Sequence, residues 1–123
     1  MTITELGEIL GDGAVVAVAA QAAGGKAEIG GGYTSDLLSD VMANAKTGDV
    51  LVTIQAHRNT VAVAGIVGIA VIVVCNGREV PADMAEAARD EGIAVFVSPE
   101  SQFRVSGRIW TALHAEGRPV PAS

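Results

Sequence analysis

Apolar residues in the second half of the chain fall into short β-branched runs that alternate with segments of helical spacing. Continuous runs are typical of buried strands, and the 3.6-residue periodicity between them is typical of helices packed on one side. The sequence predicts strands over Val50–Ile54, Ile69–Val74 and Ile93–Val97, and helices over Thr60–Ile66, Ala82–Glu91 and Glu100–His114. This alternation predicts an α/β fold, a three-layer α/β/α sandwich around a mostly parallel sheet.

The first half of the chain is less regular. Thr4 is placed to cap a short helix that Gly11 ends, and Ala14–Ala20 has the composition of a strand. We expect a turn at 22–26, a short strand at 27–29 and, after three glycines, a helix over Leu37–Asn44 capped by Ser35 or Asp36. The length of 123 residues predicts a single domain at 1–116, followed by a flexible tail at 117–123.

Composition and charge exclude several classes of function. The net charge of −6 repels phosphate backbones and anionic lipid, so we expect neither a nucleic-acid partner nor a membrane surface. The apolar run Val61–Cys75 has 15 residues, fewer than a bilayer requires, and we interpret it as a buried helix followed by a buried strand. One cysteine, and no signal peptide at the N-terminus, predict a cytoplasmic protein.

Polar side chains gather after the predicted strands and beside three consecutive glycines. The crevice beyond the carboxyl ends of parallel strands is the usual ligand site of such sheets. Glycines before a helix would let backbone N–H groups approach an anion, although a tight turn with a capping side chain explains the same residues. The predicted ligand-binding residues are Gly31, Gly32, Tyr33, Ser35, Asp36, Thr53, Gln55, His57, Asn59 and Asn76.

The two histidines have both functional and structural interpretations. His57 is either a hydrogen-bonding or proton-transfer group facing a ligand, or a solvated loop residue beside Asn59, which is placed to cap the next helix. His114 lies near the end of the last predicted helix, where a cation complements the helix dipole.

Motifs of the common phosphate and metal sites are incomplete. The stretch Gly24–Lys26 lacks both the earlier glycine and the following hydroxyl residue of a P-loop, and the run Gly30–Gly32 lacks the spacing of a dinucleotide fingerprint. Asp36 and Asp40 are one helical turn apart, but further oxygen ligands for a cation are not evident nearby.

Cys75 ends an apolar strand and is expected to be a small buried hydrophobe. Together with the incomplete motifs, this predicts no catalytic residues, no metal and no cofactor.

Three segments, Gly31–Ala45, Gly48–Asp49 and Thr53–Asn59, resemble the small stand-alone DRTGG-domain proteins. The resemblance covers about residues 3–114. It departs from the family in the stretch that gives the family its name, which usually has Asp-Arg a few residues before Thr-Gly-Gly. In this chain Lys26-Ala27 stands near the Asp-Arg positions, and Gly30 replaces the Thr before Gly31-Gly32.

The resemblance implies a fold like the N-terminal domain of the kinase/phosphatase that acts on the sugar-transport phosphocarrier protein. Its kinase site lies in a different domain, so no kinase activity is implied here. In larger relatives such domains accompany nucleotide-sensing domains of the cystathionine-synthase type in regulated pyrophosphatases, and look like regulatory, dimerising modules.

Three hypotheses follow. The first is a non-catalytic regulatory or sensor domain that homodimerises and binds a small anionic ligand, a nucleotide or phosphometabolite. The second is a purely structural interaction module for a partner enzyme, since half of the residues are apolar. The third is an enzyme of unknown type that uses His57 with Asp36.

Overall fold

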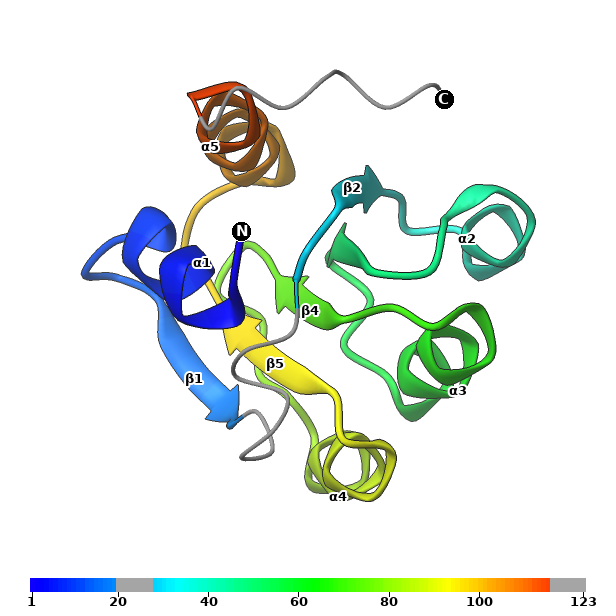
Figure 1. Ribbon diagram of the computed structural model, residues 1–123. Coiled ribbons are helices and arrows are strands. Elements are labelled where there is room, and N and C mark those ends of the chain that lie inside the picture. The colour runs from blue at the N-terminus through cyan, green and yellow to red at the C-terminus, as the bar shows by residue number, and fades with distance from the viewer. Residues whose placement is uncertain (20–27, 116–123) are drawn as a thin grey trace.

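A computed structural model describes residues 1–19 and 28–115. In these residues the chain forms five helices and five strands (Figure 1). The helices are α1 (Ile3–Leu10), α2 (Leu38–Asn44), α3 (Arg58–Val67), α4 (Ala82–Glu91) and α5 (Gln102–Ala115). The strands are β1 (Val15–Val18), β2 (Gly31–Thr34), β3 (Asp49–Thr53), β4 (Val71–Val74) and β5 (Ala94–Val97).

The strands form one sheet in the order β1-β5-β4-β3-β2. Strands β2 to β5 are parallel, with Val52 paired to Val73 and Val73 to Phe96, whereas β1 runs antiparallel to β5. All four residues of β4 are buried, because helices cover both faces of the central strands. The predicted mostly parallel sheet is confirmed.

Helices lie on both faces of this sheet (Figure 1). Helices α1 and α5 contribute to one buried cluster, which includes Leu6 and Ile109. Helices α2, α3 and α4 contribute to the other, which includes Val41, Val61 and Met84. The three-layer α/β/α architecture predicted from the sequence is therefore confirmed, and the run Val61–Cys75 forms most of α3 followed by β4.

The amino-terminal elements differ in detail from the prediction. The cap of α1 is Thr2, not Thr4: its side chain accepts from the backbone N–H of Glu5, and the Glu5 carboxylate accepts from the Thr2 N–H. Of the strand expected at 27–29, the described residues 28 and 29 belong to no named strand, and Glu28 forms an isolated bridge with Thr2. The turn expected at 22–26 and the tail expected at 117–123 lie outside the described residues.

The glycine run forms a strand rather than the expected loop before a helix. Gly31 and Gly32 belong to β2, where they pair with Asp49 and Val50 of β3. A Cβ on Gly32 would lie 3.3 Å from Cγ1 of Val50 and 3.9 Å from Cγ2 of Ile109. A side chain at this position would therefore crowd Val50 of the neighbouring strand β3, whereas its distance to Ile109 of α5 would be an ordinary van der Waals contact.

Two predicted caps are also wrong. Helix α2 has Leu37 at its N-cap without a side-chain cap, and Asp36 turns instead toward β3. Helix α3 begins two residues earlier than expected, because His57 rather than Asn59 is its cap. By contrast, α4 has the predicted bounds and ends at Gly92, which adopts a left-handed conformation with φ of +71°.

Candidate functional site

The loops at the carboxyl ends of the parallel strands meet along one edge of the sheet, which we call the carboxyl edge. It comprises residues 35–37 after β2, 54–57 after β3, 75–81 after β4 and 98–101 after β5. Three polar side chains at or next to this edge, those of Thr53, Thr60 and Ser98, are buried. A buried polar group requires a hydrogen-bond partner, so these side chains fix the loops in place.

Asp36 connects three elements at the carboxyl edge. Its Oδ1 atom accepts from the backbone N–H of Ile54 at 2.9 Å and from the Thr53 hydroxyl at 3.2 Å. Its Oδ2 atom accepts from Nε2 of Gln102, the first residue of α5, at 3.2 Å. Gln55 donates through Nε2 to the Asp36 backbone carbonyl at 3.0 Å. The carboxylate is thus committed to holding the loops after β2 and β3 against α5.

Gln102 carries a buried oxygen without a partner. Its Oε1 atom has no hydrogen bond to any residue that the structure describes and is shielded from the surface. Flipping the side-chain amide of Gln102 would place this oxygen next to the Asp36 carboxylate, so that two acceptors would face each other. The hydrogen bond from Nε2 to Asp36 therefore fixes the orientation of the amide. An unpaired acceptor of this kind is satisfied by an amino, amide or hydroxyl donor, or by a bound water.

Tyr33 faces α2. Its hydroxyl donates to Oδ2 of Asp40 at 2.8 Å, and Asn44 donates to Oδ1 of the same carboxylate at 2.9 Å. The Tyr33 hydrogen bond is the main cause of the lowered pKa of Asp40, and the Asp40 carboxylate in turn raises the pKa of Tyr33. Asp40 is therefore engaged by its own neighbours, on the face of the sheet where α2 and α3 pack.

His57 is exposed and has a structural role as the cap of α3. Its Nδ1 atom accepts from the backbone N–H of Asn59 at 3.0 Å, which satisfies one of the free donors in the first turn of the helix. The proton-transfer pair considered from the sequence would need His57 to contact Asp36. The hydrogen bonds of Asp36 run instead to Ile54, Thr53 and Gln102.

The loop after β4 turns at Asn76-Gly77, where both residues have positive φ, 60° and 63°. The backbone N–H groups of Asn76 and Gly77 donate to the carbonyls of Glu100 and Ser98, so this loop is tied to the loop after β5. Asn76 itself is exposed. The turn predicted from Asn-Gly is confirmed.

Cys75 is fully buried next to the same loops, as expected from the sequence. Burial, with a smaller contribution from the negative charge of Asp36, raises the pKa of its thiol to about 11. A thiol with this pKa stays protonated at neutral pH, and the thiolate is the reactive form. Cys75 therefore packs as a small apolar side chain.

Exposed arginines follow two strands at the carboxyl edge. Arg58 is the first residue of α3, and Arg78 comes directly after the Asn76-Gly77 turn. Arg108 of α5 is committed instead to Glu100, with Nη2 to Oε1 at 2.6 Å and Nε to Oε2 at 3.2 Å, and this pairing lowers the pKa of Glu100. Arg58 and Arg78 bring positive charge to this edge, which also carries the carboxylates of Asp36, Glu79 and Glu100.

Neither a metal site nor a membrane span emerges from the described ranges. Within residues 1–19 and 28–115, no three His, Cys, Asp or Glu side chains lie close enough together to hold a metal ion. None of the helices in those ranges combines the length and the apolar character needed to cross a membrane.

The structure brings together only some of the residues predicted to bind ligand. Asp36, Thr53 and Gln55 form one hydrogen-bonded cluster. Around it lie the exposed or half-buried residues Ser35, His57, Asn59 and Asn76, whereas Gly31, Gly32 and Tyr33 belong to β2.

Sequence reasoning missed Thr60, which donates to the Gln55 carbonyl at 2.8 Å, and Gln102. For Thr60 the sequence gave only a weak signal, a hydroxyl residue at the third position of α3. Gln102 gave none, because its role depends on a contact with a residue distant in sequence.

A solved structure has the same fold. It is the crystal structure of the CBS and DRTGG domains of the regulatory region of Clostridium perfringens pyrophosphatase, complexed with an activator, diadenosine tetraphosphate. The two chains superpose with a TM-score of 0.67 at 15% sequence identity, over 88% of this chain and 45% of the other, so this chain spans less than half of that structure. No protein-family model and no curated protein matches the sequence. The likeness supports the fold implied by the DRTGG resemblance.

Proposed function

We propose that this chain is a non-catalytic regulatory domain of the DRTGG type that binds a small anionic ligand, in the first instance a nucleotide, and works as a homodimer. The observation that carries the ligand proposal is the carboxyl edge, where a fixed polar cluster around Asp36 lies on the same edge as two exposed arginines. The similar pyrophosphatase region was crystallised with a nucleotide activator, which supports this class of ligand.

The two chemical parts of a nucleotide suit different groups at this edge. Arg58 and Arg78 would hold the phosphate. The carbonyl oxygen of Gln102 is shielded from the surface, and it would accept from an amino group of the base or from a bridging water only if the loops at this edge moved to uncover it. The remaining ligand residues proposed from the sequence are Gly31, Gly32, Tyr33, Ser35, Asp36, Thr53, Gln55, His57, Asn59 and Asn76.

Calorimetric titration tests the ligand proposal. We expect diadenosine tetraphosphate, ATP or AMP to bind and to raise the melting temperature, because a ligand that binds only the native state stabilises it by mass action. The variants Arg58→Gln and Arg78→Gln should each weaken binding at least tenfold. The control Arg89→Gln removes the same charge from the last turn of α4 and should leave the affinity unchanged. Absence of any binding at millimolar nucleotide or inorganic phosphate would contradict the proposal.

A second candidate is an interaction module that takes no small ligand and binds a partner enzyme. The exposed aromatic side chains of α5 favour it: Phe103 is 87% exposed and Trp110 is 52% exposed. If every titration is negative while self-association or association with an enzyme persists, this second function replaces the first.

A further inference from the structure

Helix α5 exposes two parallel rows of residues on its outer side. The first row, which we call the aromatic stripe, consists of Phe103, Gly107, Trp110 and His114. The second row, which we call the groove row, consists of Arg104, Arg108, Thr111 and Ala115. Within each row the residues are four, three and four positions apart, the spacing that brings side chains to the same side of a helix.

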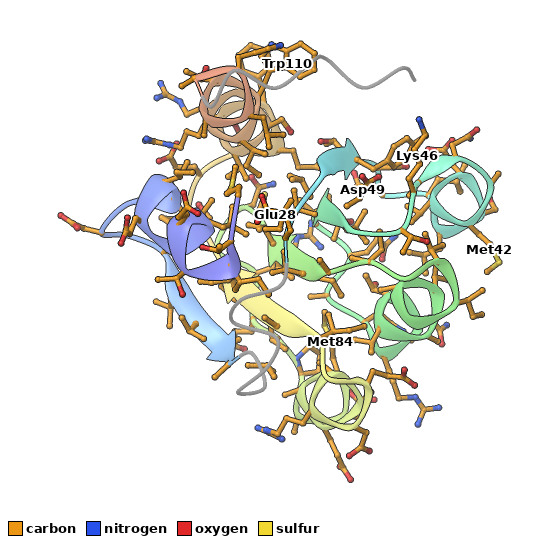
Figure 2. The ribbon with its side chains drawn as sticks, in the orientation of Figure 1. Glu28, Met42, Lys46, Asp49, Met84 and Trp110 are labelled. Carbon is orange, nitrogen blue, oxygen red and sulfur yellow. The ribbon has the colours of Figure 1, made fainter. Side chains whose placement is uncertain are left out.

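The aromatic stripe has the character of a contact surface. Phe103 is 87% exposed, and the rings of Trp110 and His114 pack edge to face with centroids 4.3 Å apart. Figure 2 shows Trp110 on the outer side of α5, away from the sheet. Exposed apolar groups that lie together in this way usually mark a site of interaction.

The groove row borders an open groove of about 460 Å³ between α1 and α5. The groove is lined by Ile9 of α1 and by Gly107, Arg108, Thr111, Ala112 and Ala115 of α5. Most of these side chains are small or apolar, so the groove suits an apolar side chain of a partner. Gly107 belongs to both the groove and the aromatic stripe.

The fold itself does not require glycine at position 107. A Cβ placed there would meet no atom within 4 Å, and glycine is among the least favourable residues in a helix interior. Gly107 does permit a second helix to approach closely, because the distance between packed helices depends on the side chains at the contact.

The charge of α5 is opposite to that of the whole chain. Residues 102–115 contain two arginines and no Asp or Glu, although the chain carries a net charge of −6. Glu100 forms a salt bridge with Arg108, whereas Arg104 forms none with any residue in the described ranges. Glu100 also interacts with Arg104 electrostatically, but one carboxylate leaves the two guanidinium groups with a net positive charge. Acidic groups of a partner would complement this charge.

A second copy of this chain does not suit this face. Two α5 helices packed on each other would bring the arginines of both copies together. The acidic side of α4, with Asp83 and Glu86, could meet α5 of another copy only head to tail, and such contacts generate rings or filaments rather than a pair. A homodimer of the proposed function would therefore use another surface.

We propose that this face of α5 binds an acidic amphipathic helix of a different protein. The partner helix lies along the aromatic stripe and crosses it at Gly107. One of its apolar side chains enters the groove beside Ala112 and Ala115, and its carboxylates lie over Arg104. Tryptophan and arginine are the residue types that most often dominate binding energy, so Trp110 and Arg104 are the main contacts. The inference takes the second candidate function further, by naming the chemistry of the partner, and is independent of the ligand site.

Selection from a display library of helical peptides tests this chemistry. The peptides have about 20 residues, which span about 30 Å and exceed the length of α5. Leucine is fixed along one face, the other positions are randomised, and tryptophan is left out. We expect the enriched peptides to be rich in Asp and Glu. Trp110 is the only tryptophan of the chain, so its fluorescence should shift to shorter wavelength when such a peptide binds.

Three variants locate the bound peptide. Arg104→Glu should weaken binding of the acidic peptides at least tenfold, because it places a carboxylate opposite their own. Arg89→Glu makes the same charge change on α4, which covers the other face of the sheet, and should leave the affinity unchanged. Phe103→Ala should also weaken binding without affecting the fold, since its side chain is exposed. Circular dichroism should show the same helix content for all variants.

Several outcomes overturn the inference. They are a selection without enrichment, enriched peptides that are rich in Lys and Arg, and acidic peptides that bind Arg104→Glu as well as the wild type. Self-association in sedimentation velocity that Phe103→Ala abolishes would assign the face to a second copy instead. Nucleotide affinity of Phe103→Ala, expected to equal that of the wild type, separates a failure here from a failure of the ligand site.

Discussion

Gln102 donates from its Nε2 atom to the Oδ2 atom of Asp36 over 3.2 Å, although 66 positions separate the two residues. This contact holds the first turn of α5 against the loop after β2. The other oxygen of the same carboxylate accepts from the backbone N–H of Ile54. One side chain thus sets the spacing of three elements at the carboxyl edge, and any ligand bound there meets an edge that is already organised.

Replacing Asp36 by Asn should destabilise the domain. The carboxylate accepts three hydrogen bonds, and an amide in its place presents its NH₂ group to at least one of the donors from Ile54, Thr53 or Gln102. Leaving one such donor without an acceptor costs about 1–3 kcal/mol. Urea denaturation measures this loss of unfolding free energy.

The matched control for this experiment is Asp90→Asn. Asp90 is exposed on α4, so the same chemical change there should alter stability by less than about 0.5 kcal/mol. Equal stabilities for Asp36→Asn and Asp90→Asn would mean that the Asp36 contacts do not hold the carboxyl edge together.

His57 should contribute to stability as the cap of α3. His57→Ala removes the acceptor of the Asn59 N–H and should lower the unfolding free energy by about 1 kcal/mol. His57→Asn keeps a capping side chain and should retain most of that free energy. Thermal or urea denaturation of the three proteins decides this. If the alanine variant keeps full stability, the hydrogen bond seen here has no energetic value, and the exposed ring is left with a role in binding alone.

The sequence predicted the order and type of the elements after residue 49 because buried parallel strands and amphipathic helices produce strong, distinct periodicities. Helix α4 has the predicted bounds, since Pro81 and Gly92 mark both of its ends. Strand β2 was missed because its sequence begins with two glycines, which carry no side-chain pattern. Its pairing with β3 decides its conformation.

The candidate site was predicted only where neighbours in the sequence are neighbours in space. The grouping of polar residues at strand ends correctly placed Thr53 and Gln55 beside Asp36. The capping role of His57 was assigned to Asn59, because histidine is an uncommon cap and the local pattern favours asparagine. The place of Gln102 depends on how α5 crosses the sheet, which local patterns do not encode.

Removing the Tyr33 hydroxyl should raise the pKa of Asp40. The hydrogen bond from Tyr33 favours the ionised carboxylate and is the main reason that the pKa of Asp40 lies below its ordinary value. In Tyr33→Phe the pKa should return toward that value, and an NMR titration of the Asp40 carboxyl carbon reads it directly. The remaining bond from Asn44 should keep part of the shift. An unchanged titration curve would assign the shift to Asn44 and Ser35 instead.

Stability should fall in alkaline solution as Cys75 ionises in the unfolded chain. Burial, with a smaller effect of the Asp36 charge, raises the pKa of this thiol from 9.0 to about 11 in the folded protein. Its contribution is therefore fully present below pH 9 and is lost as the pH rises toward 11, at about 1.4 kcal/mol per pH unit between the two values. The difference in unfolding free energy between the wild type and Cys75→Ala, measured across this window, isolates the thiol from other titrating groups. That difference should shrink or reverse as the pH rises, because alanine cannot ionise in the unfolded chain. A difference that stays constant from pH 9 to 11 would show that the folded thiol ionises as readily as the unfolded one, and would place it in contact with water.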